Sequence, residues 1–244
     1  MKITFVGTSH GAPSAERSCS CTMIESGGSV YFIDAGAPVI DNLLRMGKSV
    51  ESLRAVFLTH THSDHAVGMV NLAGLINWYY HKAAADFYVP EENLIEATKN
   101  WLIAAGDGEI EADRVRFKVP TEGVVYEDEN IKVEYIKTGH SSKIRSYAIL
   151  VTEGNTRVLF GGDFSQDLKR ADVPEIIKEE LDGFVCEMAH FKLPHLASYL
   201  ETCRAKKVFF THVFPLDNYN DIERAKSDYC FEIFAPSDSD VFVI

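Results

Sequence analysis

The stretch Leu58-Thr59-His60-Thr61-His62-Ser63-Asp64-His65 places three imidazoles and one carboxylate within six positions. It follows the apolar run 55–58, which predicts a short buried strand. It precedes residues 66–75, which predict a helix that opens close behind the cluster. A chain leaving a strand in this way points alternate side chains to the same side. The stretch therefore decides where a polar site and one strand-to-helix connection of the fold lie.

The histidines of this stretch have the chemistry of metal ligands. A single histidine near a strand end is more often solvated or structural. Three imidazoles and an acid this close lose solvation and repel one another when protonated, unless a cation binds them. His60 and His62 can hold one cation together, while Asp64 and His65 can reach a second one beside it. Imidazole and carboxylate suit zinc, iron and manganese.

Composition limits the remaining possibilities. The 244 residues are 46% hydrophobic and 25% charged, with a formal net charge of −12. This composition predicts one globular domain, residues 1–244, with a full core. No apolar run reaches the roughly 18 residues of a membrane span. The first residues already alternate like a strand and do not form the apolar segment of a signal peptide. We therefore expect a cytoplasmic protein without a membrane partner. The net negative charge disfavours a large nucleic acid as partner but permits a small anionic substrate at a site that holds divalent metal ions.

Periodicity and turn residues predict two groups of strands with helices between them. Strands are expected at 2–6, 22–25, 30–34, 55–58, 87–90, 115–119, 124–126, 131–136, 147–152, 157–160, 184–187, 208–211 and 240–244. Helices are expected at 38–46, 66–75, 91–105, 174–181, 193–203 and 220–227. The pattern predicts an α/β fold of two packed sheets with helices over both outer faces.

Three more candidate ligands follow predicted strands. His140 comes after strand 131–136, Asp163 after strand 157–160 and His212 after strand 208–211. Each alone is more often a loop residue near solvent. Four strands that end in metal-competent side chains favour a shared site.

The ordered set His60, His62, Asp64 and His65, followed by His140, Asp163 and His212, resembles the motif of the metallo-β-lactamase fold, H-x-H-x-D-H with a later lone His, Asp and His. The resemblance covers nearly the whole chain. It implies a four-layer αβ/βα sandwich with two mixed sheets. It also implies two divalent metal ions, zinc first, with manganese or iron as alternatives.

By the same resemblance, each ligand has an expected role. The first ion would be held by His60, His62 and His140. The second ion would be held by Asp64, His65 and His212. Asp163 would bridge the two, and Asp34 resembles the family's buried aspartate that hydrogen-bonds the histidine loop from behind, although a simple turn residue is the alternative.

The start of the chain indicates a branch of this family. Gly7-Thr8-Ser9-His10-Gly11-Ala12-Pro13 with Arg17-Ser18-Cys19-Ser20 resembles the opening of ribonuclease Z and of small cyclic-nucleotide-like phosphodiesterases. Those relatives carry a catalytic histidine in the place that His190 occupies. Ribonuclease Z usually inserts a long arm between the lone histidine and the bridging aspartate, whereas His140 and Asp163 are joined here only by strand, turn and strand. A small phosphodiester is therefore expected rather than folded RNA.

The resulting hypothesis is a dinuclear metal-dependent hydrolase, a phosphodiesterase that uses a metal-bridging hydroxide. Asp64 would orient the hydroxide or take its proton, and His190 would protonate the leaving alkoxide unless it is a structural histidine. The alternatives are an acyl hydrolase such as a lactonase or thioesterase, a tRNA-processing endonuclease, and a non-catalytic metal-binding scaffold. The physiological substrate and the oligomeric state, with a homodimer among the alternatives, stay open.

Overall fold

Two seven-stranded sheets form the centre of the protein. The computed structural model describes residues 1–165 and 173–244. The strand orders are β14-β1-β2-β3-β4-β5-β6 and β13-β12-β11-β10-β9-β8-β7. The strands of the first sheet are β1 (Lys2–Gly7), β2 (Cys21–Ser26), β3 (Ser29–Ile33), β4 (Leu53–Phe57), β5 (Ala85–Tyr88), β6 (Val115–Lys118) and β14 (Val241–Val243). The strands of the second sheet are β7 (Gly123–Glu127), β8 (Lys132–Thr138), β9 (Ser146–Glu153), β10 (Thr156–Phe160), β11 (Leu181–Glu187), β12 (Ala205–Thr211) and β13 (Glu232–Phe234).

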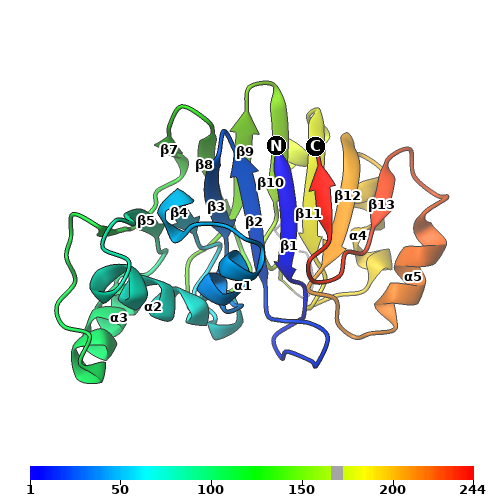
Figure 1. Ribbon diagram of the computed structural model, residues 1–244. Helices are drawn as coiled ribbons and strands as arrows, with labels where there is room; N and C mark the ends of the chain where they lie inside the picture. Colours follow the sequence, from blue (N-terminus) through cyan, green and yellow to red (C-terminus); the bar gives the residue numbers. More distant parts are fainter. Residues whose placement is uncertain (166–172) are drawn as a thin grey trace.

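Helices cover the outer face of each sheet. The described helices are α1 (Val39–Arg45), α2 (Ser63–Trp78), α3 (Glu92–Ala105), α4 (Leu193–Leu200) and α5 (Asn218–Ala225). Figure 1 shows α2 and α3 at one side of the molecule and α4 and α5 at the other. The predicted α/β architecture, two mixed sheets with helices on both outer faces, is confirmed.

Alternation along the strands explains the layers. In β3, Tyr31 and Ile33 belong to the core between the sheets, whereas Val30 and Phe32 pack under the helices of the first sheet. A strand buried on both faces needs apolar residues at nearly every position. This is why the apolar runs of the sequence predicted the central strands well.

The structure differs from the local expectations at three places. The helix expected at 66–75 begins at Ser63, so Asp64 and His65 lie in its first turn, where the helix dipole favours a carboxylate. The helix expected at 174–181 is only a 3₁₀ turn, Glu175–Lys178, because the chain from Leu181 pairs with β12 in the second sheet. The short strand β13 was not predicted, since its three residues carry too little pattern.

The strand directions bring the polar loops together. β3 and β4 run parallel in the first sheet, and β10, β11 and β12 run parallel in the second. Their carboxyl ends therefore share one edge of the sandwich, the usual place for a site in parallel α/β sheets. The β1–β2 connection extends below this edge (Figure 1). Within the described residues, no helix is both long and apolar enough to cross a bilayer.

Candidate metal centre

Three histidine rings converge at the end of β4 and β8. His60 is fully buried, and its Nε2 lies 3.0 Å from His62 Nδ1. His140, which follows β8, has its Nε2 3.2 Å from the same His62 nitrogen. Ring nitrogens this close to one another can bind one cation together, because each neutral imidazole has one nitrogen with a free lone pair.

The second group lies beside the first. Asp64 Oδ2 is 3.5 Å from His65 Nε2 and 3.5 Å from His212 Nε2. Asp64 and His65 come from the first turn of α2, and His212 follows β12. One ligand atom from each of the three lies within 4.8 Å of the others.

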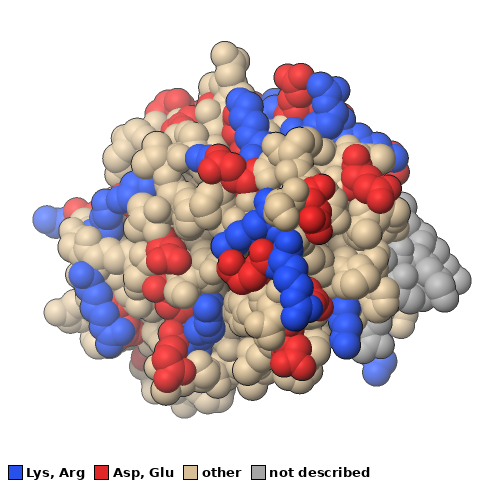
Figure 2. Space-filling view, turned by 90° about the vertical axis from the view of Figure 1, so that its right-hand side faces the viewer, with Lys and Arg blue, Asp and Glu red and all other residues tan. Residues whose placement is uncertain are grey.

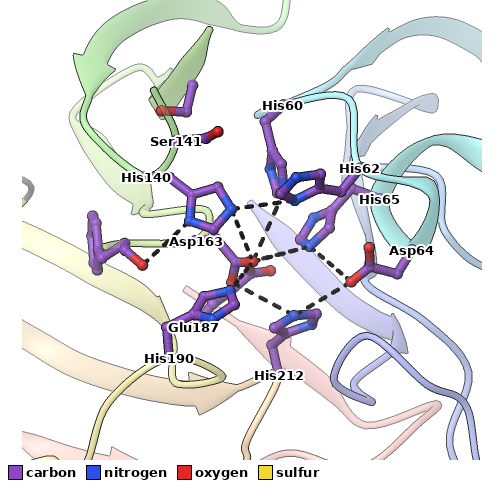
Figure 3. A network of polar contacts seen from close by, with 12 residues as sticks. His60, His62, Asp64, His65, His140, Ser141, Asp163, Glu187, His190 and His212 are labelled. Atoms are coloured by element: carbon purple, nitrogen blue, oxygen red, sulfur yellow. Dashed lines mark hydrogen bonds and ion pairs between the residues drawn. The ribbon is translucent and has the colours of Figure 1, made fainter. Parts of the chain in front are cut away.

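Asp163 joins the two groups, as Figure 3 shows. Its Oδ2 lies 3.7 Å from His140 Nε2 and 3.8 Å from His65 Nε2, and its Oδ1 lies 3.6 Å from His212 Nε2. The preceding Gly162 has a φ of +61°, and a Cβ there would lie 2.9 Å from Thr59 Cβ, so the turn that aims the carboxylate inward needs glycine. All seven predicted ligands thus meet at one place, while their division between two ions stays a prediction.

Asp34 supports the histidine loop from behind, as expected. Its Oδ1 accepts a hydrogen bond of 2.7 Å from the Thr59 backbone N–H, and its Oδ2 accepts one of 2.8 Å from the Thr59 hydroxyl. The same Oδ2 lies 2.8 Å from His65 Nδ1. With Nδ1 donating to the Asp34 carboxylate, Nε2 is the nitrogen of His65 that faces the site and that a cation would bind.

The donor set fits divalent metal ions. His65 Nε2 and Asp163 Oδ1 are buried and have no hydrogen-bond partner among the described residues. An unpartnered buried polar atom costs about 1–3 kcal/mol, and a cation would satisfy both atoms together. Burial lowers the pKa of His60 well below its ordinary value, which keeps its nitrogen free to bind a cation at neutral pH.

His190 lies at the rim of this group. Its Nε2 is 2.9 Å from Asp163 Oδ2, and its side chain is 33% exposed. The hydrogen bond to Asp163 raises the pKa of His190, although partial burial opposes the change. An imidazole that reaches both the site and solvent can pass a proton between them. Whether it is catalytic stays a prediction.

Glu187 is a site residue that sequence reasoning missed. It ends β11, is 5% exposed, and accepts a 2.6 Å hydrogen bond from the Ser20 hydroxyl through Oε1. Its Oε2 lies 3.9 Å from His65 Nε2 and has no hydrogen-bond partner in the described chain. Burial raises the pKa of Glu187 to about 8. An acid at the end of an otherwise apolar predicted strand was the signal that could have identified it.

A cavity of about 520 Å³ opens beside the second ligand group. Its walls come from the β1–β2 connection, the start of α1 and the start of α2, and include Arg17, Cys19, Asp64 and Val67. This volume is in the range of small-molecule sites. Of the two basic residues near His140, Lys143 is exposed and Arg145 is paired with Glu91.

A family model described as "Anti-Pycsar protein Apyc1" matches residues 1–230. Among curated proteins, the chain is 27% identical over 162 residues to a ribonuclease Z of Shouchella clausii, covering 63% of this chain and 48% of that protein. It is 31% identical over 160 residues to a ribonuclease Z of Pseudomonas putida, covering 64% of this chain and 47% of that one. The chain thus spans about half the length of these curated relatives.

Solved structures share the fold. The metallo-β-lactamase fold protein YhfI of Bacillus subtilis has a TM-score of 0.78 at 19% identity, covering 99% of this chain and 98% of that one. Human tRNase Z, short form, has a TM-score of 0.77 at 20% identity, covering 100% of this chain and 99% of that one. A diphosphatase of the PhnP family has a TM-score of 0.70 at 18% identity, covering 100% of this chain and 97% of that one. The expected metallo-β-lactamase fold is therefore confirmed, and the curated matches agree with the expected resemblance to ribonuclease Z.

Proposed function

Because the chain belongs to the family described as anti-Pycsar protein Apyc1, with the metallo-β-lactamase fold, we propose that it is a dinuclear metal-dependent hydrolase that cleaves a small phosphodiester. The observation that carries the proposal is the position of Asp163 between two groups of ligand atoms. Zinc is the proposed metal because imidazole nitrogens outnumber carboxylate oxygens in both groups.

The residues divide the work of hydrolysis. Two bound divalent ions would supply Lewis acidity and a water of lowered pKa. Asp64, in the first turn of α2, would orient the attacking water and accept its proton. His190, with its raised pKa, would hold a proton toward the oxygen of the leaving group. A proton delivered there is needed because an alkoxide is a poor leaving group.

Several features favour a small substrate. Between His140 and Asp163 the chain forms only the hairpin of β9 and β10, so no arm projects from this part of the molecule. The formal net charge is −12. On the face seen in Figure 2, basic and acidic side chains are interspersed and do not form a basic patch of the kind that binds a polyanion. The cavity beside Asp64 has room for a small molecule.

A second candidate function is RNA cleavage. The curated relatives are ribonucleases Z, at 27–31% identity over less than two thirds of this chain. These matches support a shared hydrolytic chemistry. They favour a tRNA precursor as substrate only if RNA can bind without an arm between His140 and Asp163.

A substrate panel tests the proposal. The zinc-loaded and manganese-loaded protein would be assayed with bis-p-nitrophenyl phosphate, a cyclic nucleoside monophosphate, a lactone, a thioester, a β-lactam and a tRNA precursor. We expect turnover of the small phosphodiesters. Preferential turnover of the lactone or thioester would support an acyl hydrolase, and preferential cleavage of the tRNA precursor would support the endonuclease.

Replacement of His190 tests its role within that reaction. We expect His190→Ala to lower kcat for a phosphodiester with an alkoxide leaving group by about 10²- to 10⁴-fold, the range for a general acid. The loss should be much smaller with p-nitrophenolate, which leaves without a proton. His81→Ala, an exposed histidine away from the site, is the matched control. Equal losses with both leaving groups would contradict the role of proton donor.

A further inference from the structure

His212 holds its place in the second ligand group by its backbone. Its φ is +54°, in the left-handed region that side chains other than glycine adopt at a cost. The backbone N–H of His212 donates a 3.1 Å hydrogen bond to the carbonyl oxygen of Thr8. This bond joins the end of β12 in one sheet to the end of β1 in the other.

The imidazole of His212 has no support of the kind that the neighbouring histidines have. His60 Nδ1 lies 3.1 Å from the Thr59 hydroxyl, and His65 Nδ1 lies 2.8 Å from Asp34. His140 Nδ1 lies 3.3 Å from the carbonyl oxygen of Phe164. In contrast, His212 Nδ1 is buried and has no hydrogen-bond partner in residues 1–165 and 173–244. The ring direction of His212 is therefore set by its backbone and by packing.

Thr8 is in turn held by the C-terminal segment. Asp238 Oδ1 accepts a 2.9 Å hydrogen bond from the Thr8 backbone N–H and a 2.7 Å bond from the Thr8 hydroxyl. Its Oδ2 accepts a 2.6 Å bond from the backbone N–H of Ser18. Arg17 Nη1 also donates to the Thr8 hydroxyl and, at 2.8 Å, to the carbonyl oxygen of Pro236. Thr8 is 1% exposed while Asp238 and Arg17 are half-buried, so these bonds are partly shielded from water.

From these contacts we propose that Asp238 is a positioning residue for the second metal ion, acting through Thr8 on His212. The inference rests on the proposed function, because it assumes that Asp64, His65 and His212 hold an ion. Asp238 fixes both the N–H and the hydroxyl of Thr8, and thereby the carbonyl oxygen that anchors the strained turn at His212. Without Asp238, that turn is free to relax, and the imidazole moves away from Asp64.

The expected effect is selective for one site. Loss of a supporting partner of a metal ligand lowers metal affinity by about 10- to 100-fold. We expect Asp238→Ala to weaken binding of the second ion by at least about tenfold and to leave the first ion unchanged. Thr8→Val, which removes only the hydroxyl, should weaken the same ion by a smaller factor and provides a second variant if Asp238→Ala does not fold.

Two backgrounds isolate the ions. His140→Ala leaves the group of Asp64, His65 and His212 intact, and His212→Ala leaves the other group intact. Zinc affinity would be measured in each background by competition with a fluorescent chelator, with and without Asp238→Ala. The matched control is Asp240→Ala, which removes the same charge from the same segment. Within the described residues, the Asp240 carboxylate accepts a side-chain hydrogen bond from the Ser237 N–H and none from Thr8.

The outcomes separate the proposals. A loss of zinc affinity confined to the His140→Ala background supports the positioning role. Equal losses in both backgrounds, equal losses with Asp240→Ala, or no loss would overturn it. If the unsubstituted protein binds fewer than two zinc ions, both the inference and the proposed function fail. If it binds two ions and the selective loss appears without phosphodiester turnover, the inference stands and the proposed function fails.

Discussion

Asp34→Asn is the substitution that tests the support of the metal centre most directly. Both carboxylate oxygens of Asp34 accept hydrogen bonds, from the Thr59 backbone N–H on one side and from the Thr59 hydroxyl and His65 Nδ1 on the other. An amide has only one oxygen, so one side must face an NH₂ group. The Thr59 N–H is fixed by the backbone and can only donate, which turns the amide oxygen toward it and the NH₂ group toward His65.

The cost follows from the tautomer of His65. An NH₂ group beside Nδ1 requires Nδ1 to accept, which moves the ring proton to Nε2, the nitrogen that faces Asp64 and Asp163. Loss of a partner of this kind costs about 10- to 100-fold in metal affinity, or about 1.4–2.7 kcal/mol. The metal-free protein should lose less, about 1–2 kcal/mol of unfolding free energy, because one hydrogen bond to a charged group is replaced by one to a neutral group.

Metal titration and chemical unfolding together measure both effects. Zinc affinity by chelator competition should fall for the ion held by His65, while urea unfolding of the chelator-treated protein should show a fold that is nearly intact. Asp41→Asn removes an exposed carboxylate from the first turn of α1 and should change neither quantity by more than about 0.5 kcal/mol. If Asp34→Asn bound both ions with unchanged affinity, the tautomer argument would be wrong.

Three further predictions concern stability. Burial raises the pKa of Glu187 from 4.5 to about 8. The contribution of protonated Glu187 to the stability of the fold is therefore fully present below pH 4.5 and is lost as the pH rises toward 8. In thermal scans of the metal-free protein, Tm relative to that of Glu187→Gln should fall across this pH interval. Gly36→Ala would place a Cβ 1.7 Å from the Asp64 carbonyl oxygen and should cost about 2 kcal/mol or more in urea unfolding. Gly28→Ala, with open space around a φ of +84°, should cost only about 1 kcal/mol and serves as its control. Removal of metal with a chelator should lower Tm, because at 100 times its Kd each bound ion adds about 2.7 kcal/mol to the native state; an unchanged Tm would count against a metal centre at this edge.

The sequence predicted that the candidate ligands lie together because four of them follow the end of a strand closely. His60, His140, Asp163 and His212 come one to three residues after the last residue of a strand that the structure contains. Parallel strands place their carboxyl ends at a common edge, so local pattern and a general rule of sheet geometry were enough. The same pattern was less informative about helices: apolar spacing from Ala66 onward marked the buried face of α2 but not its first turn, which is polar.

Other features depended on contacts between distant segments. Glu187 reads as the end of a strand, and only the packing of Ser20 and His65 around it makes it part of the site. β14 joins the first sheet beside β1 across the whole chain length. The contact between Thr8 and Asp238 spans 230 positions. No local pattern encodes such pairs.

The sequence by itself therefore determined which side chains have the chemistry to bind metal and that strand ends bring them to one edge, because residue type and strand periodicity are local properties. The tertiary structure alone decided how those side chains are oriented. The tautomer of His65 depends on Asp34, and the strained turn of His212 depends on Thr8 and Asp238. Orientation is set by hydrogen bonds between segments far apart in the chain, and these exist only once both sheets have packed together.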